Sequence, residues 1–234
     1  MEDKRSWLLA VELAGPQGLL ALEGPGGLFH NSWEGGERSK RLFVAAGELL
    51  RRAGIGPHDL GLVGVGKGPG SFTGIRMGVM AAKALAEVLG IPLVAPDSLA
   101  AVAVGPEGAE RVAVALDARR GELYVALFMM EGNGVFGFPQ RLEGPLVCAP
   151  EETARLLREW TSGLAGELLL VGSGVDAYPD IWPPEARRAE RRGPDPAGFV
   201  WLCRQLHMRG ELEDHLSLKP LYLRRPEVGK VSYA

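Results

Sequence analysis

The residues with the clearest potential for chemistry form a glycine-rich run at positions 66–74, Gly-Lys-Gly-Pro-Gly-Ser-Phe-Thr-Gly. A phosphate-binding P-loop needs the pattern GxxxxGK followed by a serine or threonine whose hydroxyl holds Mg²⁺. Residues 61–67 match the first part, but Gly68 takes the place of the hydroxyl residue, and the first five positions lie in a predicted strand. The run does not match the dinucleotide fingerprint GxGxxG either. The pattern therefore argues against a P-loop and predicts a strand, a glycine loop and then a helix.

Two interpretations of this loop are open. It is a tight strand-to-helix turn if Pro69 restricts one backbone angle and the glycines take left-handed conformations. It is a binding or interface loop if the first N–H groups of the helix face an anion or another chain. Ser71, Phe72 and Thr73 favour the second interpretation, because they place two hydroxyls and an aromatic ring in a loop otherwise lined by glycine.

Patterns for metal binding and nucleophilic catalysis are missing from the sequence. The histidines are scattered, with no pair at a spacing of three or four residues: His30, His58, His207 and His215. Ser173 follows Gly172 directly and so lacks the GxSxG frame of a hydrolase. We therefore predict no catalytic residue and no metal site.

A group of charged residues surrounds a predicted hairpin turn: Asp117, Arg119, Arg120 and Glu122. A solvated turn is the simplest explanation of this cluster. A role in lobe closure or in contact with a partner is the functional alternative.

Composition limits the class of protein. The chain has 234 residues, 46% hydrophobic and 24% charged, which is typical of a globular protein with one large or two small domains. A net charge of −3 argues against a dedicated nucleic-acid binder, but it does not exclude a subunit that works on RNA beside a more basic partner. Cys148 and Cys203 lack a CxxC spacing, which favours reduced thiols. The apolar stretch 7–11 ends at Glu12, so we expect no signal peptide, no membrane span and a cytoplasmic protein.

Hydrophobic periodicity predicts two lobes of mixed α/β structure. The N-terminal lobe, residues 1–105, is expected to contain strands 7–13, 19–22, 27–33, 60–65 and 91–95 and helices 39–53, 72–89 and 99–104. The C-terminal lobe, residues 106–215, is expected to contain strands 111–116, 122–130, 134–147 and 168–171 and helices 150–160 and 196–208, with a connection over 178–196. The tail, about 216–234, is expected to pack back on the N-terminal lobe, anchored by Tyr222.

The helix after the glycine loop has more apolar surface than one sheet can cover. Its charged residues Arg76, Lys83 and Glu87 fall on one stripe only about 40° wide. A helix that covers one side of a sheet needs an apolar stripe of roughly 100°. Either a second helix of the same chain or a partner protein must cover the remainder, and both alternatives are open.

Several segments together resemble the TsaB family, also called YeaZ. They are residues 66–78, 83–86, 90–94, 97–99, 117–124 and 220–224. The resemblance implies an actin-like ATPase fold of the sugar kinase and Hsp70 class, with two similar lobes that each hold a mixed sheet flanked by helices. It also implies a role in making N6-threonylcarbamoyladenosine at position 37 of tRNA. Family members act as a non-catalytic subunit that pairs with a homologous catalytic subunit, TsaD, beside an ATPase subunit, TsaE.

The resemblance implies a partner interface on the helices 39–53 and 74–89. Expected interface residues are Phe43, Leu50, Phe72, Gly74, Ile75, Met77, Gly78, Val79 and Met80. The same surface would be buried in a homodimer when the partner is absent. On this view the chain is a structural and activating subunit that reaches tRNA through the complex.

Two departures from catalytic relatives argue against chemistry in this chain alone. The usual start resembles Asp-Thr-Ser-Thr, whereas residues 12–15 are Glu-Leu-Ala-Gly, without a hydroxyl. Residues 38–44, where relatives carry a His-x-x-x-His pair, contain no histidine. We therefore expect no cofactor of its own, while ATP or ADP at the partner interface stays open. The alternatives are a small-molecule kinase or ATPase of the same fold, or a peptidase.

Overall fold

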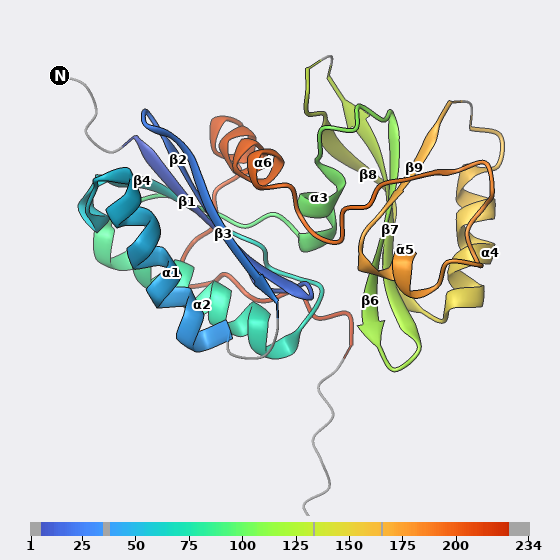
Figure 1. Cartoon of the computed structure of the whole chain (residues 1–234), viewed down its shortest axis with the longest axis horizontal. Helices are drawn as coiled ribbons and strands as arrows, with labels where there is room; N and C mark the ends of the chain where they lie inside the picture. The colour runs from blue at the N-terminus through green and yellow to red at the C-terminus, as the bar shows by residue number, and fades with distance from the viewer. Residues whose placement is uncertain (1–5, 35–37, 133, 165, 225–234) are drawn as a thin grey trace, which may run out of the picture.

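The computed structural model describes residues 6–34, 38–132, 134–164 and 166–224. At residues 38–40 it describes the backbone alone. These residues form two lobes side by side, each built on a five-stranded mixed sheet (Figure 1). The described part of the chain contains no helix long and apolar enough to cross a membrane.

The first sheet has the strand order β3-β2-β1-β4-β5. The hairpin strands β1 (Trp7–Glu12), β2 (Gln17–Gly24) and β3 (Gly27–Glu34) are antiparallel. The strands β4 (Leu60–Val65) and β5 (Leu93–Val94) continue the sheet in parallel with β1, because helical crossovers separate them in the sequence.

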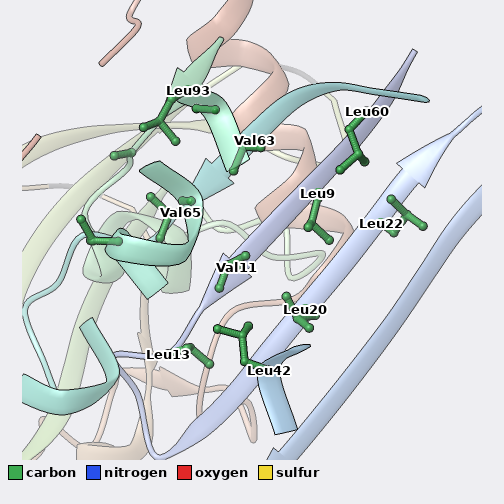
Figure 2. Close-up of a cluster of buried hydrophobic side chains, with 14 of the residues drawn as sticks. Leu9, Val11, Leu13, Leu20, Leu22, Leu42, Leu60, Val63, Val65 and Leu93 are labelled. Atoms are coloured by element: carbon green, nitrogen blue, oxygen red, sulfur yellow. The ribbon is translucent and has the colours of Figure 1, made fainter. Parts of the chain in front are cut away.

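Helices cover both faces of this sheet (Figure 1). The helices α1 (Arg38–Ala53) and α2 (Phe72–Leu89) lie on one face, and the short 3₁₀ helix η1 (Pro57–Asp59) precedes β4. Figure 2 shows side chains of β1, β2 and β4 gathered with Leu42 of α1 into the core beneath them. On the other face lie α3 (Ser98–Ala103) and α6 (Pro196–Met208).

The second sheet has the order β10-β9-β6-β7-β8. Its strands are β6 (Arg111–Arg119), β7 (Glu122–Glu131), β8 (Phe138–Cys148), β9 (Leu168–Val171) and β10 (Arg187–Arg188). The helices α4 (Pro150–Thr161) and α5 (Ser173–Ala177) stand beside one face, and α3 packs on the other. The small helix α3 therefore contributes to both lobes.

The structure corrects the expected boundary between the lobes. The sequence predicts helix α6 in the C-terminal lobe, but Phe199 and Cys203 pack against Leu8 and Ala21 of the first sheet. Gly64 permits this close approach, because a Cβ there would lie 2.4 Å from Cys203 Sγ. Burial raises the pKa of the Cys203 thiol. Neither Cys203 nor the half-buried Cys148 forms a disulfide bond.

Several predicted elements differ in extent from the observed ones. Strand β5 has two residues rather than five, β6 continues to Arg119, and β8 starts at Phe138 rather than 134. The prediction missed α5 and β10, which are too short to show a period of their own. Side chains cap both helices that follow the glycine loop: Ser71 Oγ accepts a hydrogen bond from Gly74 N at the start of α2, and Asp97 accepts one from Ala100 N at the start of α3.

Candidate partner interface and interlobe cleft

The glycine loop is a tight connection in which four backbone N–H groups donate hydrogen bonds inside the chain. Gly66 N donates to Val11 O, Lys67 N to Pro96 O, and Ser71 N to Ala14 O at 2.8 Å. Gly68 N donates to the hydroxyl of Ser98 at 3.1 Å. Gly70 has φ 153° and lies so close to Ala14 O that a Cβ would stand 2.3 Å from it. These four N–H groups are therefore used within the turn, whereas the first N–H groups of α2, which the binding interpretation concerns, come after them.

Glu12 lies beneath this loop as an internal connector. Its side chain is buried, its Oε2 accepts a hydrogen bond from Ser98 Oγ at 2.7 Å, and its Oε1 accepts one from Ala14 N. Gly66 lies directly against the carboxylate, because a Cβ at this position would overlap the carboxylate carbon and Oε2 of Glu12. The carboxylate therefore joins β1, the glycine loop and the start of α3, and it does not project into solvent.

An apolar groove of about 720 Å³ runs along the outer side of α1 and α2. Three of its side chains are unusually exposed for their type: Phe43 at 71%, Met80 at 64% and Val88 at 78%. Contiguous apolar surfaces of this kind are typical of interaction sites, so the groove is a candidate partner interface. The groove is lined by Leu42, Phe43, Phe72, Thr73, Arg76, Met77, Met80, Ala81, Ala84, Leu85 and Val88.

The expected interface residues divide into three groups in the structure. Phe43 and Met80 are exposed in the groove, and half-buried Phe72 and Met77 line it. Leu50 is half-buried against the first core and lies outside the groove. The remaining four are buried and correct the prediction: Gly74, Ile75, Gly78 and Val79.

The correction has a simple geometric reason. Val79 and Ile75 lie on the side of α2 that packs against the first sheet, in one core with Val11 and Val65. The sequence missed Val88 and Ala84, although both fall on the same helical stripe as Met77. Counting apolar residues shows that the helix has two apolar faces, but it does not show which face the sheet takes.

A second depression, of about 780 Å³, lies between the lobes. The turn after β1 and the start of α2 line it from the first lobe, and the β6–β7 turn lines it from the second. Three members of the predicted charged cluster are brought to it: Asp117, Arg119 and Arg120. Glu122 is not among the lining residues, and it pairs with Arg224 of the C-terminal tail.

The β6–β7 turn holds two arginines in a conformation that favours glycine. Arg119 and Arg120 have φ values of 63° and 58°, and Gly121 follows at 72°. Arg119 of β6 lies opposite Glu122 of β7 in the antiparallel register, so residues 120 and 121 form the two-residue hairpin loop. Both have positive φ, as a type I′ turn requires. Asp117 Oδ1 accepts a hydrogen bond from Arg119 N at 2.8 Å. Non-glycine residues in this region concentrate at functional sites, so the two arginines are candidates for contact with a ligand or partner.

A substitution at Arg120 tests whether its positive φ strains the backbone. We expect Arg120→Asn to raise the free energy of unfolding by about 0.5–1 kcal/mol, because asparagine tolerates the left-handed conformation better. Urea denaturation measures the change. The matched control is Arg188→Asn, at an exposed arginine outside the positive-φ positions, which should give no gain. An equal gain at both positions would show that the backbone of Arg120 carries no strain.

The two lobes share one topology. In each, three antiparallel strands are followed by two parallel strands: β3-β2-β1-β4-β5 in the first lobe and β8-β7-β6-β9-β10 in the second. A duplicated mixed sheet flanked by helices, with a cleft between the halves, defines the actin-like ATPase class, which includes the sugar kinases.

Comparison with known proteins identifies the family within this class. A family model described as TsaD, tRNA N6-adenosine threonylcarbamoyltransferase, matches residues 36–162. The tRNA threonylcarbamoyladenosine biosynthesis protein TsaB of Escherichia coli K12 is 30% identical over 194 residues, covering 80% of this chain and 81% of that protein. The Haemophilus influenzae TsaB is 27% identical over 80% of this chain and 79% of its own length. The solved structure of YeaZ from Pseudomonas aeruginosa superimposes with a TM-score of 0.78 at 26% identity, covering 93% of this chain and all of that one. The chain belongs to the TsaB family, also called YeaZ.

Proposed function

We propose that this chain is a structural and activating subunit in the synthesis of N6-threonylcarbamoyladenosine at position 37 of tRNA. Its partner would be a TsaD-like catalytic subunit, and a TsaE-like ATPase would act with the pair. The observation that carries the proposal is the apolar groove on α1 and α2, in a chain whose relatives are named for this pathway. The proposal places the chain in the cytoplasm, and it places contact with tRNA in the assembled complex.

The groove supports a protein partner because its apolar side chains are surplus to the fold. The opposite side of α2 already covers the first sheet through Ile75, Val79 and Ala82. The groove side adds Phe43, Met80 and Val88, which remain exposed. Burying such residues removes apolar surface from water and favours association. A homologous subunit would present equivalent helices, and in its absence a second copy of this chain would cover the same surface.

The first turn supports the proposal that this chain is not catalytic by itself. An actin-like ATPase needs a carboxylate and hydroxyls near Mg²⁺ and phosphate, but Glu12 is buried and bonded to Ser98. Leu13 and Ala14 follow it and are also buried. We therefore propose no nucleotide cofactor belonging to this chain alone. ATP or ADP at the joint with the partner stays part of the proposal.

Light scattering during size exclusion tests the pairing. The chain, the TsaD homologue of the same organism and their mixture are measured separately at micromolar concentration. We expect a heterodimer in the mixture, and we expect tRNA modification by the reconstituted set only when this chain is present. Independent elution of the two chains would contradict the proposal. ATP turnover by the isolated chain, abolished by Glu12→Gln, would instead support a kinase or ATPase.

A further inference from the structure

The C-terminal segment 213–224 is here called the strap. Its first residues, 213–218, pack against the N-terminal lobe. Glu213 N donates to Leu93 O at 2.8 Å, and its carboxylate pairs with Lys67 Nζ at 2.7 Å. Lys83 Nζ of α2 donates to the carbonyls of residues 216 and 218 at 3.1 and 3.2 Å. Leu218 is buried in the core of the first lobe. Each of these contacts ties the strap to β5, the glycine loop or α2.

The strap then crosses to the second lobe within six residues. Leu221 N still donates to Lys67 O of the first lobe at 2.7 Å. Leu223, two residues later, packs against the core of the second lobe. Arg224 pairs with Glu122 and donates to Ala118 O, so it reaches the hairpin whose turn borders the cleft. Figure 1 shows this last described stretch, in red, running from the first lobe toward the second.

One stack of side chains stands between the strap and the apolar groove. Arg76 Nε donates to the Tyr222 hydroxyl at 2.9 Å, and the Arg76 guanidinium lies 3.8 Å from the centre of the Phe72 ring. The rings of Phe72 and Tyr222 are 5.1 Å apart. Phe72 lines both the groove and the cleft, while Arg76 lines the groove and Tyr222 lines the cleft. This stack is therefore a shared wall of the two sites.

We propose that the strap couples occupancy of the groove to closure of the cleft between the lobes. The inference rests on the proposed function in one respect: the occupant of the groove is the TsaD-like subunit. A protein docked on Phe72 and Arg76 excludes water from the stack, and cation–π attraction is stronger when its partners are desolvated. A stronger contact between Arg76 and Phe72 restricts the motion of Tyr222, which contacts both side chains. Tyr222 in turn holds Leu223 and Arg224 against the second lobe, so docking favours the closed arrangement.

The experiment measures the distance between the lobes in the full chain. Spin labels are placed on the exposed positions His58 and Glu151 through His58→Cys and Glu151→Cys, in a Cys148→Ser background that leaves the buried Cys203 in place. Double electron–electron resonance then gives the distribution of label distances. The test variants are Tyr222→Ala and Arg224→Gln. The matched control is Lys219→Ala, which removes an exposed side chain from the same strap.

We expect a narrow distribution for the parent and the control, and a broader one shifted to longer distance for both test variants. Adding the TsaD homologue should narrow the parent distribution further and should have no such effect on Tyr222→Ala. Unchanged distributions in both test variants would overturn the proposal. If Tyr222→Ala does not fold, Arg224→Gln decides, because it replaces a partly exposed side chain at the end of the strap.

The same measurement separates the two proposals. Failure of the TsaD homologue to bind the parent would contradict the proposed function, while the variants would still show whether the strap holds the lobes. Binding of the homologue without any change in the parent distribution would leave the proposed function intact and overturn the coupling.

Discussion

Met80→Glu is expected to abolish pairing with the TsaD-like subunit at concentrations where the parent chain forms a complex. Met80 is 64% exposed in the isolated chain and lines the apolar groove on α1 and α2. Docking would bury the new carboxylate among apolar side chains without a cationic partner, which costs several kcal/mol. We expect a loss of about 2–4 kcal/mol of binding free energy, which is a fall of roughly 30- to 1000-fold in affinity.

Isothermal titration with the TsaD homologue measures this loss, and the chain offers a matched control. Met208→Glu makes the same chemical change at a methionine that is 69% exposed, but on α6 at the opposite face of the first sheet. The control should bind like the parent, and both variants should keep the parental melting temperature. Equal affinities for Met80→Glu and Met208→Glu would exclude the groove as the interface. Gly78 is unsuitable for this test, because it is buried against β1 and β4.

Gly66→Ala is expected to cause the largest loss of stability among these predictions. The new Cβ would overlap the Glu12 carboxylate, which is buried and hydrogen-bonded to Ser98 and to the backbone at Ala14. To relieve this overlap, either Glu12 must break its hydrogen bonds inside the protein, or the glycine loop must move away from the sheet. Either change leaves buried polar groups without partners, so we expect a loss of about 3–4 kcal/mol.

Chemical denaturation measures this loss against Gly47→Ala. Gly47 lies exposed in α1, and nothing stands within 4 Å of a Cβ added there. This control should gain about 0.5–1 kcal/mol, since alanine is the better helix former. The double variant Gly66→Ala with Glu12→Ala should be less destabilised than the sum of its single variants, because the overlap is then removed. Strict additivity would show that the Glu12 carboxylate does not oppose the new methyl group.

Much of the local structure was predictable because it depends on neighbouring residues. Strand β4 and helices α2 and α6 have the predicted bounds. The caps at Ser71 and Asp97, and the left-handed Gly90 after α2, are short-range signals of the kind that sequence displays directly. The charged cluster was also expected at a hairpin turn, although its strained arginines were not.

The candidate site was predictable only in part. The composition of α2 shows that its apolar surface exceeds what one sheet can cover, which points to a partner. Helical periodicity gives the angle between two side chains but not the direction of the sheet. For that reason Ile75 and Val79 were expected in the interface with Met80, and the structure places them in the core.

The sequence by itself determined the order of the longer helices and strands, the mixed α/β character of two similar lobes and the surplus apolar surface of one helix. The tertiary structure decided which face of α2 remains open, that α6 returns to the first sheet, that Glu12 points inward, and that Arg224 reaches Glu122 across the lobes. The physical reason is the separation along the chain between the residues that interact. Turns, caps and periodicity depend on residues a few positions apart, whereas these four outcomes depend on burial and contacts between segments that are distant in the chain.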